Sequence, residues 1–213
     1  VGDSLGELIR SGFFAPWVAN HVHLGFRRRG QNLHRADGSL PVTPAVDVVP
    51  VAWDGIGTVV ETGPTYARLD APEHPDPGER FAAIAGRIAR GRGVSGARRR
   101  SPADGEHVAL DGGLAHYARG GVLTRDAGDR AADGNADGTI SFLDHSIGDA
   151  SGRNAAWREV DVVANGARIT GVSLFAGIDS EFGTKLVCPD RDFAKGQQVR
   201  VAIRDSDDPI RLG

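Results

Sequence analysis

Apolar and polar residues alternate over several short stretches of the chain, with the period of two that is typical of β-strands burying one face. The clearest stretches lie in the C-terminal third, at residues 157–163, 167–175, 183–188 and 197–205. Asn165 and Gly166 separate the first two of them, and an Asn-Gly pair between alternating runs predicts a tight hairpin. The pattern therefore predicts consecutive antiparallel strands in this region.

The N-terminal half contains further strand patterns. Residues 17–29 alternate in the same way, and the valine-rich stretches 45–53 and 57–69 also predict strands. Pro50 lacks the N–H that a central strand must donate to its neighbour, so the strand around it is expected at a sheet edge.

Two stretches have helical spacing instead. Residues 80–90 place Phe81, Ile84 and Ile88 on one stripe, which predicts an amphipathic helix. Residues 4–11 begin with Ser4 as a candidate N-cap and have Glu7 in capping-box spacing, which predicts a shorter helix.

The middle of the chain is less regular. Residues 106–125 predict two short strands around Gly112 and Gly113, and residues 146–155 predict a loop. The arginine-rich segment 87–100 could bind phosphate or an acidic surface. A solvated loop in an arginine-biased chain is the interpretation we prefer.

Short strands joined by frequent turns indicate a mainly β fold, and we expect a sandwich of antiparallel strands with one or two short helices. The length suits one β-rich domain over residues 1–213. Residues 1–16 are expected to form an N-terminal extension, and a domain boundary near 125–155 is the alternative.

The composition narrows the functional classes. Basic residues number 25 and acidic residues 28, a net charge of −3, which does not favour nucleic-acid binding through bulk charge. The single cysteine, Cys188, permits no intrachain disulfide and is expected to be buried on a strand. The chain has no methionine and no apolar run of 18 residues. We therefore expect a processed, secreted protein without a membrane-spanning helix.

Residues 133–144, DGNADGTISFLD, carry the most specific chemistry in the chain. Oxygen-bearing residues occupy the positions that ligate calcium in a twelve-residue loop, and a glycine stands at the sharp turn. Carboxylates gathered this closely repel one another unless a hard cation binds between them. The pattern therefore predicts a Ca²⁺ site. Its candidate ligands are Asp133, Asn135, Asp137, Thr139 through its backbone carbonyl, Ser141 and Asp144.

This segment resembles an EF-hand calcium loop, and in particular the loops of dockerin modules, in which aspartate at the last position is common. The resemblance covers twelve residues and does not extend to flanking helices or to a second loop. It implies one calcium loop inserted into a β-rich protein. A structural role is expected, because a single loop has no helix pair to open. The alternative is an acidic turn without metal.

Three histidines form a second candidate metal group. His21 and His23 would lie on one face of the predicted strand at 17–29, and His34 could be a third ligand for zinc or copper. Solvent-facing histidines are the simpler interpretation. No local motif of a hydrolase or nucleotide-binding protein is present in the sequence.

Two functions remain. The first is a secreted, calcium-stabilised structural or adhesive protein, a self-associating subunit of a filament, tube or surface layer that uses strand addition between copies. The second is a secreted hydrolase or a carbohydrate-binding module in which calcium only stabilises the fold. A module would need exposed aromatic rings for sugars to stack on. The candidates are Trp17, Trp53, Tyr66 and Trp157.

Overall fold

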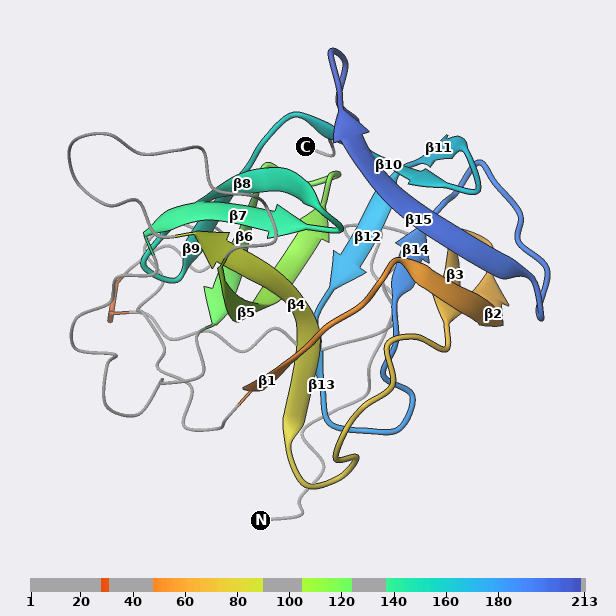
Figure 1. Ribbon diagram of the computed structural model, residues 1–213, viewed down its shortest axis with the longest axis horizontal. Coiled ribbons are helices and arrows are strands. Elements are labelled where there is room, and N and C mark those ends of the chain that lie inside the picture. Colours follow the sequence, from red (N-terminus) through yellow and green to blue (C-terminus); the bar gives the residue numbers. More distant parts are fainter. Residues whose placement is uncertain (1–27, 31–47, 90–104, 124–136, 212–213) are drawn as a thin grey trace.

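The computed structural model describes residues 28–30, 48–89, 105–123 and 137–211, and within these ranges it contains fifteen β-strands and no helix (Figure 1). The predicted mainly β fold is confirmed. The predicted helix at 4–11 and nearly all of the predicted strand at 17–29 lie outside the described residues.

Six strands close into an antiparallel barrel, in the order β4-β7-β8-β9-β6-β5, because β5 pairs with β4 as well as with β6. This barrel takes the place of the predicted sandwich. Strands β4, β5 and β6 from before residue 125 share it with strands β7, β8 and β9, which begin within segment 125–155. Its strands are β4 (Phe81–Ala89), β5 (Glu106–Leu114), β6 (Arg119–Leu123), β7 (Gly138–Phe142), β8 (His145–Ser151) and β9 (Asn154–Trp157).

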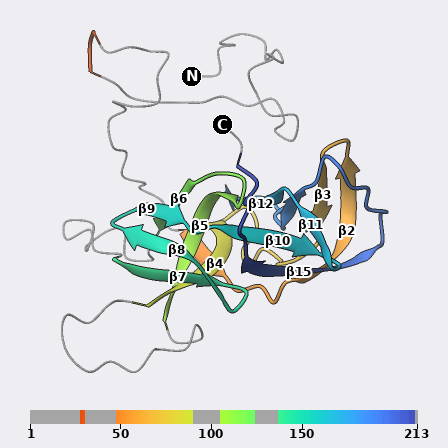
Figure 2. The same cartoon turned by 90° about the horizontal axis from the view of Figure 1, so that it is seen from above.

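A second group of strands continues from the far end of β5, in the order β12-β14-β3-β2-β15-β10-β11. Only Thr170 separates β11 from β12. Because β11 pairs with β10 and β12 pairs with β14, the sheet curves back on itself. Figures 1 and 2 show this group beside the barrel, with β12 between the two. Its strands are β2 (Ile56–Gly63), β3 (Tyr66–Leu69), β10 (Val160–Ala164), β11 (Ala167–Ile169), β12 (Gly171–Leu174), β14 (Lys185–Val187) and β15 (Gln198–Asp205).

The N-terminal half of β4 extends beyond the barrel and pairs with two short strands. Strand β1 (Val48–Val51) runs parallel to it, and β13 (Ala176–Gly177) runs antiparallel. Among the described residues β1 pairs only with β4, so the edge position predicted from Pro50 is confirmed.

The predicted helix at 80–90 is wrong, because these residues form β4. Ala82 to Gly86 are all buried, which a one-sided amphipathic helix would not require. Ile84 and Ile88 point into the core, and Gly86 lies against Leu110, whose side chain would be 2.9 Å from an added β-carbon. Strand pairing with four neighbours thus overrides the helical spacing of the apolar residues.

Two further expectations need correction. Residues 145–157 form strands β8 and β9 instead of the predicted loop at 146–155, because they complete the barrel. The two strands predicted in 106–125 exist, but Gly112 and Gly113 lie within β5 and the turn comes after Leu114.

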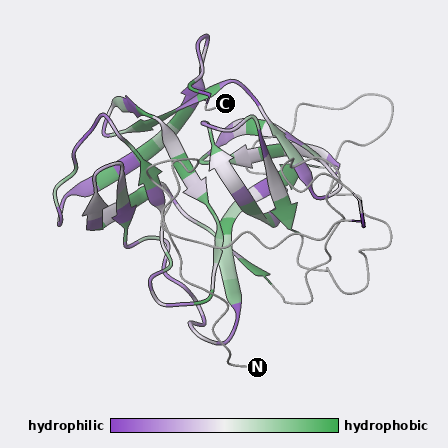
Figure 3. Cartoon of the chain, turned by 180° about the vertical axis from the view of Figure 1, so that it is seen from behind, coloured by the Kyte–Doolittle hydropathy of each residue, from purple (hydrophilic) through white to green (hydrophobic). Residues whose placement is uncertain are grey.

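The C-terminal strands and their hairpin are confirmed, except that the predicted strand at 167–175 is divided at Thr170 into β11 and β12. Asn165 and Gly166, with φ of 48° and 81°, form the tight turn between β10 and β11, where left-handed backbone suits this residue pair. Figure 3 shows hydrophobic and hydrophilic residues alternating along β15. The side chain of Asp161 on β10 is buried, and it forms ion pairs with Arg168 at 2.8 Å and Arg204 at 3.1 Å.

Candidate functional site

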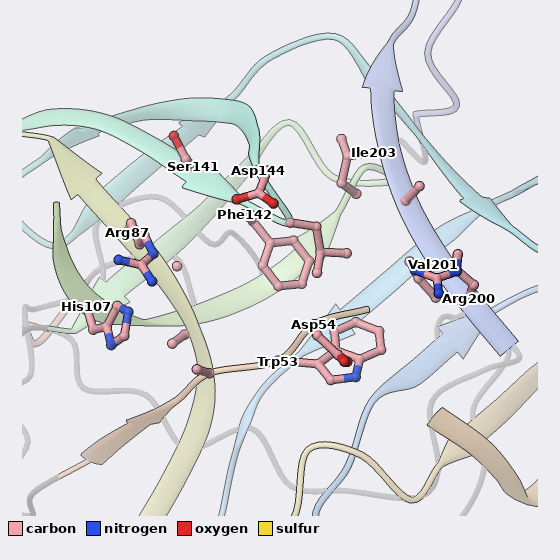
Figure 4. Close-up of a pocket in the computed structure, with 15 residues that line it drawn as sticks. Trp53, Asp54, Arg87, His107, Ser141, Phe142, Asp144, Arg200, Val201 and Ile203 are labelled. Carbon is pink, nitrogen blue, oxygen red and sulfur yellow. The ribbon is translucent and has the colours of Figure 1, made fainter. Parts of the chain in front are cut away.

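A cleft of about 380 Å³ lies between the outer face of the barrel and strand β15 (Figure 4). This size is typical of small-molecule sites, which measure roughly 300–1,000 Å³. The barrel contributes residues of β4, β5 and the β7–β8 hairpin, and the link between β1 and β2 closes another side. Segments far apart in the sequence therefore meet here. Its polar lining residues are Asp54, Arg87, His107, Ser141, Asp144 and Arg200.

Arg87 and His107 lie side by side at one end of the cleft (Figure 4). They are direct cross-strand partners on β4 and β5, a register that places β-carbons about 5 Å apart. Both are half-buried, whereas their strand neighbours Gly86 and Val108 are buried. The strand alternation thus directs an arginine and a histidine outward together. Ser141, buried on β7, is the partner of Arg87 on its other side.

Aromatic rings form the middle of the cleft. Trp53 and Phe142 have their ring centroids 6.1 Å apart, with a tilt of 34°. The indole Nε1 of Trp53 donates a hydrogen bond to the Ile56 carbonyl at 2.8 Å, which fixes the orientation of the ring. Phe142 is buried, whereas Trp53 is only half-buried. Trp53 therefore offers partly exposed aromatic surface to a ligand.

Two carboxylates, Asp54 and Asp144, also line the cleft. The Asp54 carboxylate accepts a hydrogen bond from the Ile56 backbone N–H at 3.0 Å. Asp144 follows Leu143 in the tight turn between β7 and β8, and both residues have positive φ, 47° for Leu143 and 60° for Asp144. This backbone conformation is uncommon for residues other than glycine. It places the Asp144 side chain over the cleft (Figure 4).

Strand β15 forms the opposite wall and is held in place at several points. The Arg200 backbone N–H donates to the Asn165 side chain at 2.8 Å, and the Val201 N–H donates to the Gly55 carbonyl at 2.7 Å. At the other end of the strand, His145 of the β7–β8 hairpin contacts the Asp205 carboxylate at 3.0 Å. The Arg200 side chain lies at the end of the cleft opposite Arg87 (Figure 4).

Close packing leaves no room for a side chain at Gly55, between Trp53 and β2. Its φ is +83°, and an added β-carbon would lie 2.6 Å from the Val201 carbonyl oxygen. Glycine here therefore allows the β1–β2 link to approach β15, which brings Trp53 and Asp54 to the cleft.

A second cleft of about 430 Å³ lies near β3 and contains His74 and Glu73. Both ring nitrogens of His74 already contact the backbone, at the Gly177 carbonyl and the Asp76 N–H, each at 3.1 Å. Phe182, its aromatic lining residue, is buried. This cleft therefore offers less binding surface than the one beside β15.

The predicted calcium residues are divided by strand β7. Asp133 and Asn135 lie outside the described residues, and Asp137 immediately precedes β7. Asp144 lies past its other end. A five-residue strand spans roughly 15 Å at about 3.3 Å per residue, whereas calcium ligands lie about 2.4 Å from the ion. The structure therefore does not bring Asp137 and Asp144 to one ion.

The remaining calcium candidates have other contacts. Thr139 donates its hydroxyl to the Asp149 carboxylate at 2.9 Å, and Asp137 accepts a bond from the Gly152 N–H at 3.2 Å. Calcium binding by the segment 133–144 stays a prediction. Within the described part of the chain, no three His, Cys, Asp or Glu residues are grouped as a metal site.

The other predicted site residues are distributed as follows. His21, His23 and His34 lie outside the described residues, as does most of the arginine segment, whereas Arg87 lines the cleft. Cys188 is buried just after β14, and burial raises the pKa of its thiol to about 11. It is therefore unreactive near neutral pH.

Of the four aromatic candidates, Trp53 alone is shown to line the cleft beside β15. Trp157 is buried in the core, and Trp17 lies outside the described residues. Tyr66 donates its hydroxyl to Glu61 at 2.5 Å, and this bond raises the pKa of Tyr66 and lowers that of Glu61. The Lys185 ammonium lies 4.3 Å from the centre of the Tyr66 ring, so that face is already occupied.

The pairing of Arg87 with His107 was not predicted from the sequence. They are twenty positions apart in the sequence, and only the register of β4 on β5 brings them together. The sole sequence signal is that each precedes a β-branched residue, Ile88 and Val108, and both of these are buried.

Within the described residues, no helix is long and apolar enough to cross a membrane. The model of the DUF8155 C-terminal domain, a domain of unknown function, matches residues 49–204, and the model of the DUF8155 N-terminal domain matches residues 1–44. Neither the curated proteins nor the solved structures contain a significant match to the chain.

Proposed function

The chain belongs to the DUF8155 family of domains of unknown function, and we propose that it is a carbohydrate-binding protein whose site is the cleft between the barrel and β15. The observation that carries this proposal is the combination of a half-buried tryptophan with polar side chains around it. Sugars present an apolar face of C–H groups and a rim of hydroxyls. A ligand of this kind is complementary to an aromatic surface and to the donors and acceptors of arginine, histidine and aspartate.

The cleft has the features of a binding site built before its ligand arrives. The Trp53 side chain is held by its hydrogen bond to the Ile56 carbonyl, and the Asp54 side chain by the bond it accepts from the Ile56 N–H. Side chains held this way lose little conformational entropy on binding. Binding without catalysis is the simpler function, because ligand contacts alone account for the residues that line the cleft. No general acid or nucleophile has to be assigned among them.

The test is a binding screen of the whole protein against a panel of immobilised oligosaccharides, repeated with Trp53→Ala and Trp53→Phe. We expect the wild-type protein to retain a subset of sugars, Trp53→Ala to lose them, and Trp53→Phe to keep part of the binding. Trp53→Ala protein must first show the wild-type circular dichroism spectrum. Equal binding by wild-type and Trp53→Ala protein would contradict the proposed site.

A second candidate function is the self-associating structural or adhesive subunit expected from the sequence, and one observation favours it. Strand β1 has no partner on its outer side among the described residues, and such an edge can accept a strand from another copy. Val49→Lys would place a charge on this edge. If strand addition at β1 assembles the protein, light scattering should show smaller particles for this variant, and unchanged particle size would contradict it.

A further inference from the structure

We propose that the cleft recognises a neutral sugar through two adjacent hydroxyl groups, and that the Asp144 carboxylate binds this pair. This inference rests on the proposed carbohydrate-binding function and names the feature of the sugar that the site selects. It is carried by a strained hairpin turn that places Asp144 over the cleft (Figure 4).

The turn between β7 and β8 departs from the sequence preference for its shape. Leu143 and Asp144 are its two loop residues, and φ is positive at both, 47° and 60°. Two-residue hairpin loops of this shape favour Asn-Gly, and left-handed backbone is unfavourable for leucine. The same chain has the preferred pair, Asn165 and Gly166, in the turn between β10 and β11. The β7–β8 turn therefore has its residues because of what their side chains contact.

The Leu143 side chain anchors the tip of the hairpin. It packs against the hydrophobic core, and a β-carbon added to Gly55 would lie 3.2 Å from one of its methyl groups. Leu143 thus lies directly on the link between β1 and β2. His145, on the other side of the turn, contacts the Asp205 carboxylate of β15 at 3.0 Å. These two contacts fix the backbone that carries Asp144.

Asp144 contributes no contact of this kind. Its side chain is exposed, and its carboxylate forms no hydrogen bond or ion pair within the part of the chain that the structure describes. Strained backbone of this type clusters at ligand sites. The turn therefore presents the Asp144 carboxylate to a ligand of the cleft.

A carboxylate in this position is suited to a pair of hydroxyls. Its two oxygens can each accept a hydrogen bond from one of two neighbouring hydroxyls on a sugar ring. An acidic substituent at the same place would be repelled by the like charge. In Figure 4 the Asp144 carboxylate and the Trp53 indole lie on either side of the Phe142 ring. A sugar stacked on Trp53 would therefore extend its rim of hydroxyls across Phe142 toward Asp144.

The first experiment repeats the oligosaccharide screen with Asp144→Asn protein. Asparagine tolerates left-handed backbone, so this variant removes the carboxylate and keeps the turn. We expect it to bind the selected sugar about tenfold or more weakly than wild type, because a charge-assisted hydrogen bond is lost. The matched control is Asp137→Asn, since Asp137 belongs to the same acidic segment, is exposed and does not line the cleft.

The second experiment tests the hydroxyl pair itself. The competitors are the methyl glycoside of glucose, galactose or mannose that best displaces the selected oligosaccharide, and its 3-deoxy and 6-deoxy derivatives. Loss of the 3-hydroxyl removes both adjacent pairs on the ring, whereas loss of the 6-hydroxyl removes neither. We expect the 3-deoxy derivative to compete about tenfold or more weakly than the 6-deoxy derivative.

The outcomes separate this inference from the proposed function. If sugar binding depends on Trp53 but is unchanged in Asp144→Asn protein, the inference is overturned and carbohydrate binding stands. Equal competition by the two deoxy derivatives, or an equal loss of binding in Asp137→Asn protein, has the same meaning. If the panel is negative, both proposals are overturned. If Asp144→Asn protein does not fold, Asp144→Gly replaces it, because glycine adopts left-handed backbone freely, and unchanged binding in that variant would overturn the assignment.

Discussion

A buried histidine should make the stability of this protein depend on pH. His116, in the turn after β5, is 1% exposed and lies between two glycines. A β-carbon added to Gly113 or to Gly171 would lie 2.3 Å from its ring nitrogens. Burial lowers the pKa of His116 from 6.5 to about 4, although a hydrogen bond to the Leu114 backbone opposes the shift. The folded protein therefore holds this imidazole neutral.

The sign and size of the effect follow from proton linkage. Between about pH 4 and pH 6.5 the unfolded chain binds a proton at His116 and the folded chain does not, so the free energy of unfolding rises with pH in this window. Each pKa unit corresponds to about 1.4 kcal/mol. The contribution of neutral His116 to the free energy of unfolding is therefore fully present near pH 7. The free energy of unfolding is about 2 kcal/mol lower at pH 5 and about 3 kcal/mol lower near pH 4.

Urea unfolding of wild-type and His116→Gln protein at pH 7 and pH 5 measures this contribution. The variant loses packing at both pH values, so that cost cancels in the difference between them. Asp111, an exposed residue of β5, acts in the opposite direction, because partial desolvation raises the pKa of its carboxyl, but both proteins contain it. We expect wild-type protein to lose about 2 kcal/mol more than the variant on going to pH 5. Equal losses would refute a neutral buried His116.

Three further predictions concern packing, a buried ion pair and metal. Gly171→Ala would place a β-carbon 2.4 Å from a backbone carbonyl and should cost about 1–3 kcal/mol in urea unfolding. Gly121→Ala, whose added β-carbon would lie 3.6 Å from its nearest neighbour, should not destabilise the protein. Equal losses of stability in the two variants would contradict the close packing around Gly171. Replacing both Arg168 and Arg204 by methionine leaves the buried Asp161 carboxylate without its two ion-pair partners. This double substitution should lower the free energy of unfolding by about 3–5 kcal/mol. That cost should exceed the summed single variants, and an additive result in thermal melts would argue against coupling. Millimolar calcium should raise the melting temperature of wild-type but not Asp137→Ala protein, and an absent shift would reject the predicted site.

The strands that could be predicted from sequence are those with one buried and one solvated face. On β15, Val199 and Val201 alternate with exposed residues, and the Asn165–Gly166 turn has a local backbone requirement. Both signals are contained in a few neighbouring residues. Local pattern therefore suffices for this part of the fold.

The barrel could not be predicted in the same way. Strand β4 is buried on both faces over Ala82–Gly86, so its alternation disappears, and the spacing of Ile84 and Ile88 imitates a helix. Strands β8 and β9 contain many small residues, which read as loop. Their strand structure depends on pairing with β6 and β7, information that no short window contains.

The candidate site shows the same limit. The acidic segment 133–144 is recognisable by its spacing, yet β7 extends through it and separates Asp137 from Asp144. The pair of Arg87 and His107 has no spacing to recognise, because the register of two strands creates it. Sites assembled by sheet register are therefore visible only once the pairing is known.

The central claim is that a sugar binds over Trp53 in the cleft, and ¹⁹F NMR of protein labelled with 5-fluorotryptophan tests it most directly. The chain has three tryptophans, so three signals can be assigned by single Trp→Phe variants. During titration with an oligosaccharide that the binding screen selects, we expect a saturable shift of the Trp53 signal and none for Trp157, which is buried in the core. A Trp53 signal that stays fixed while the sugar binds would contradict the account.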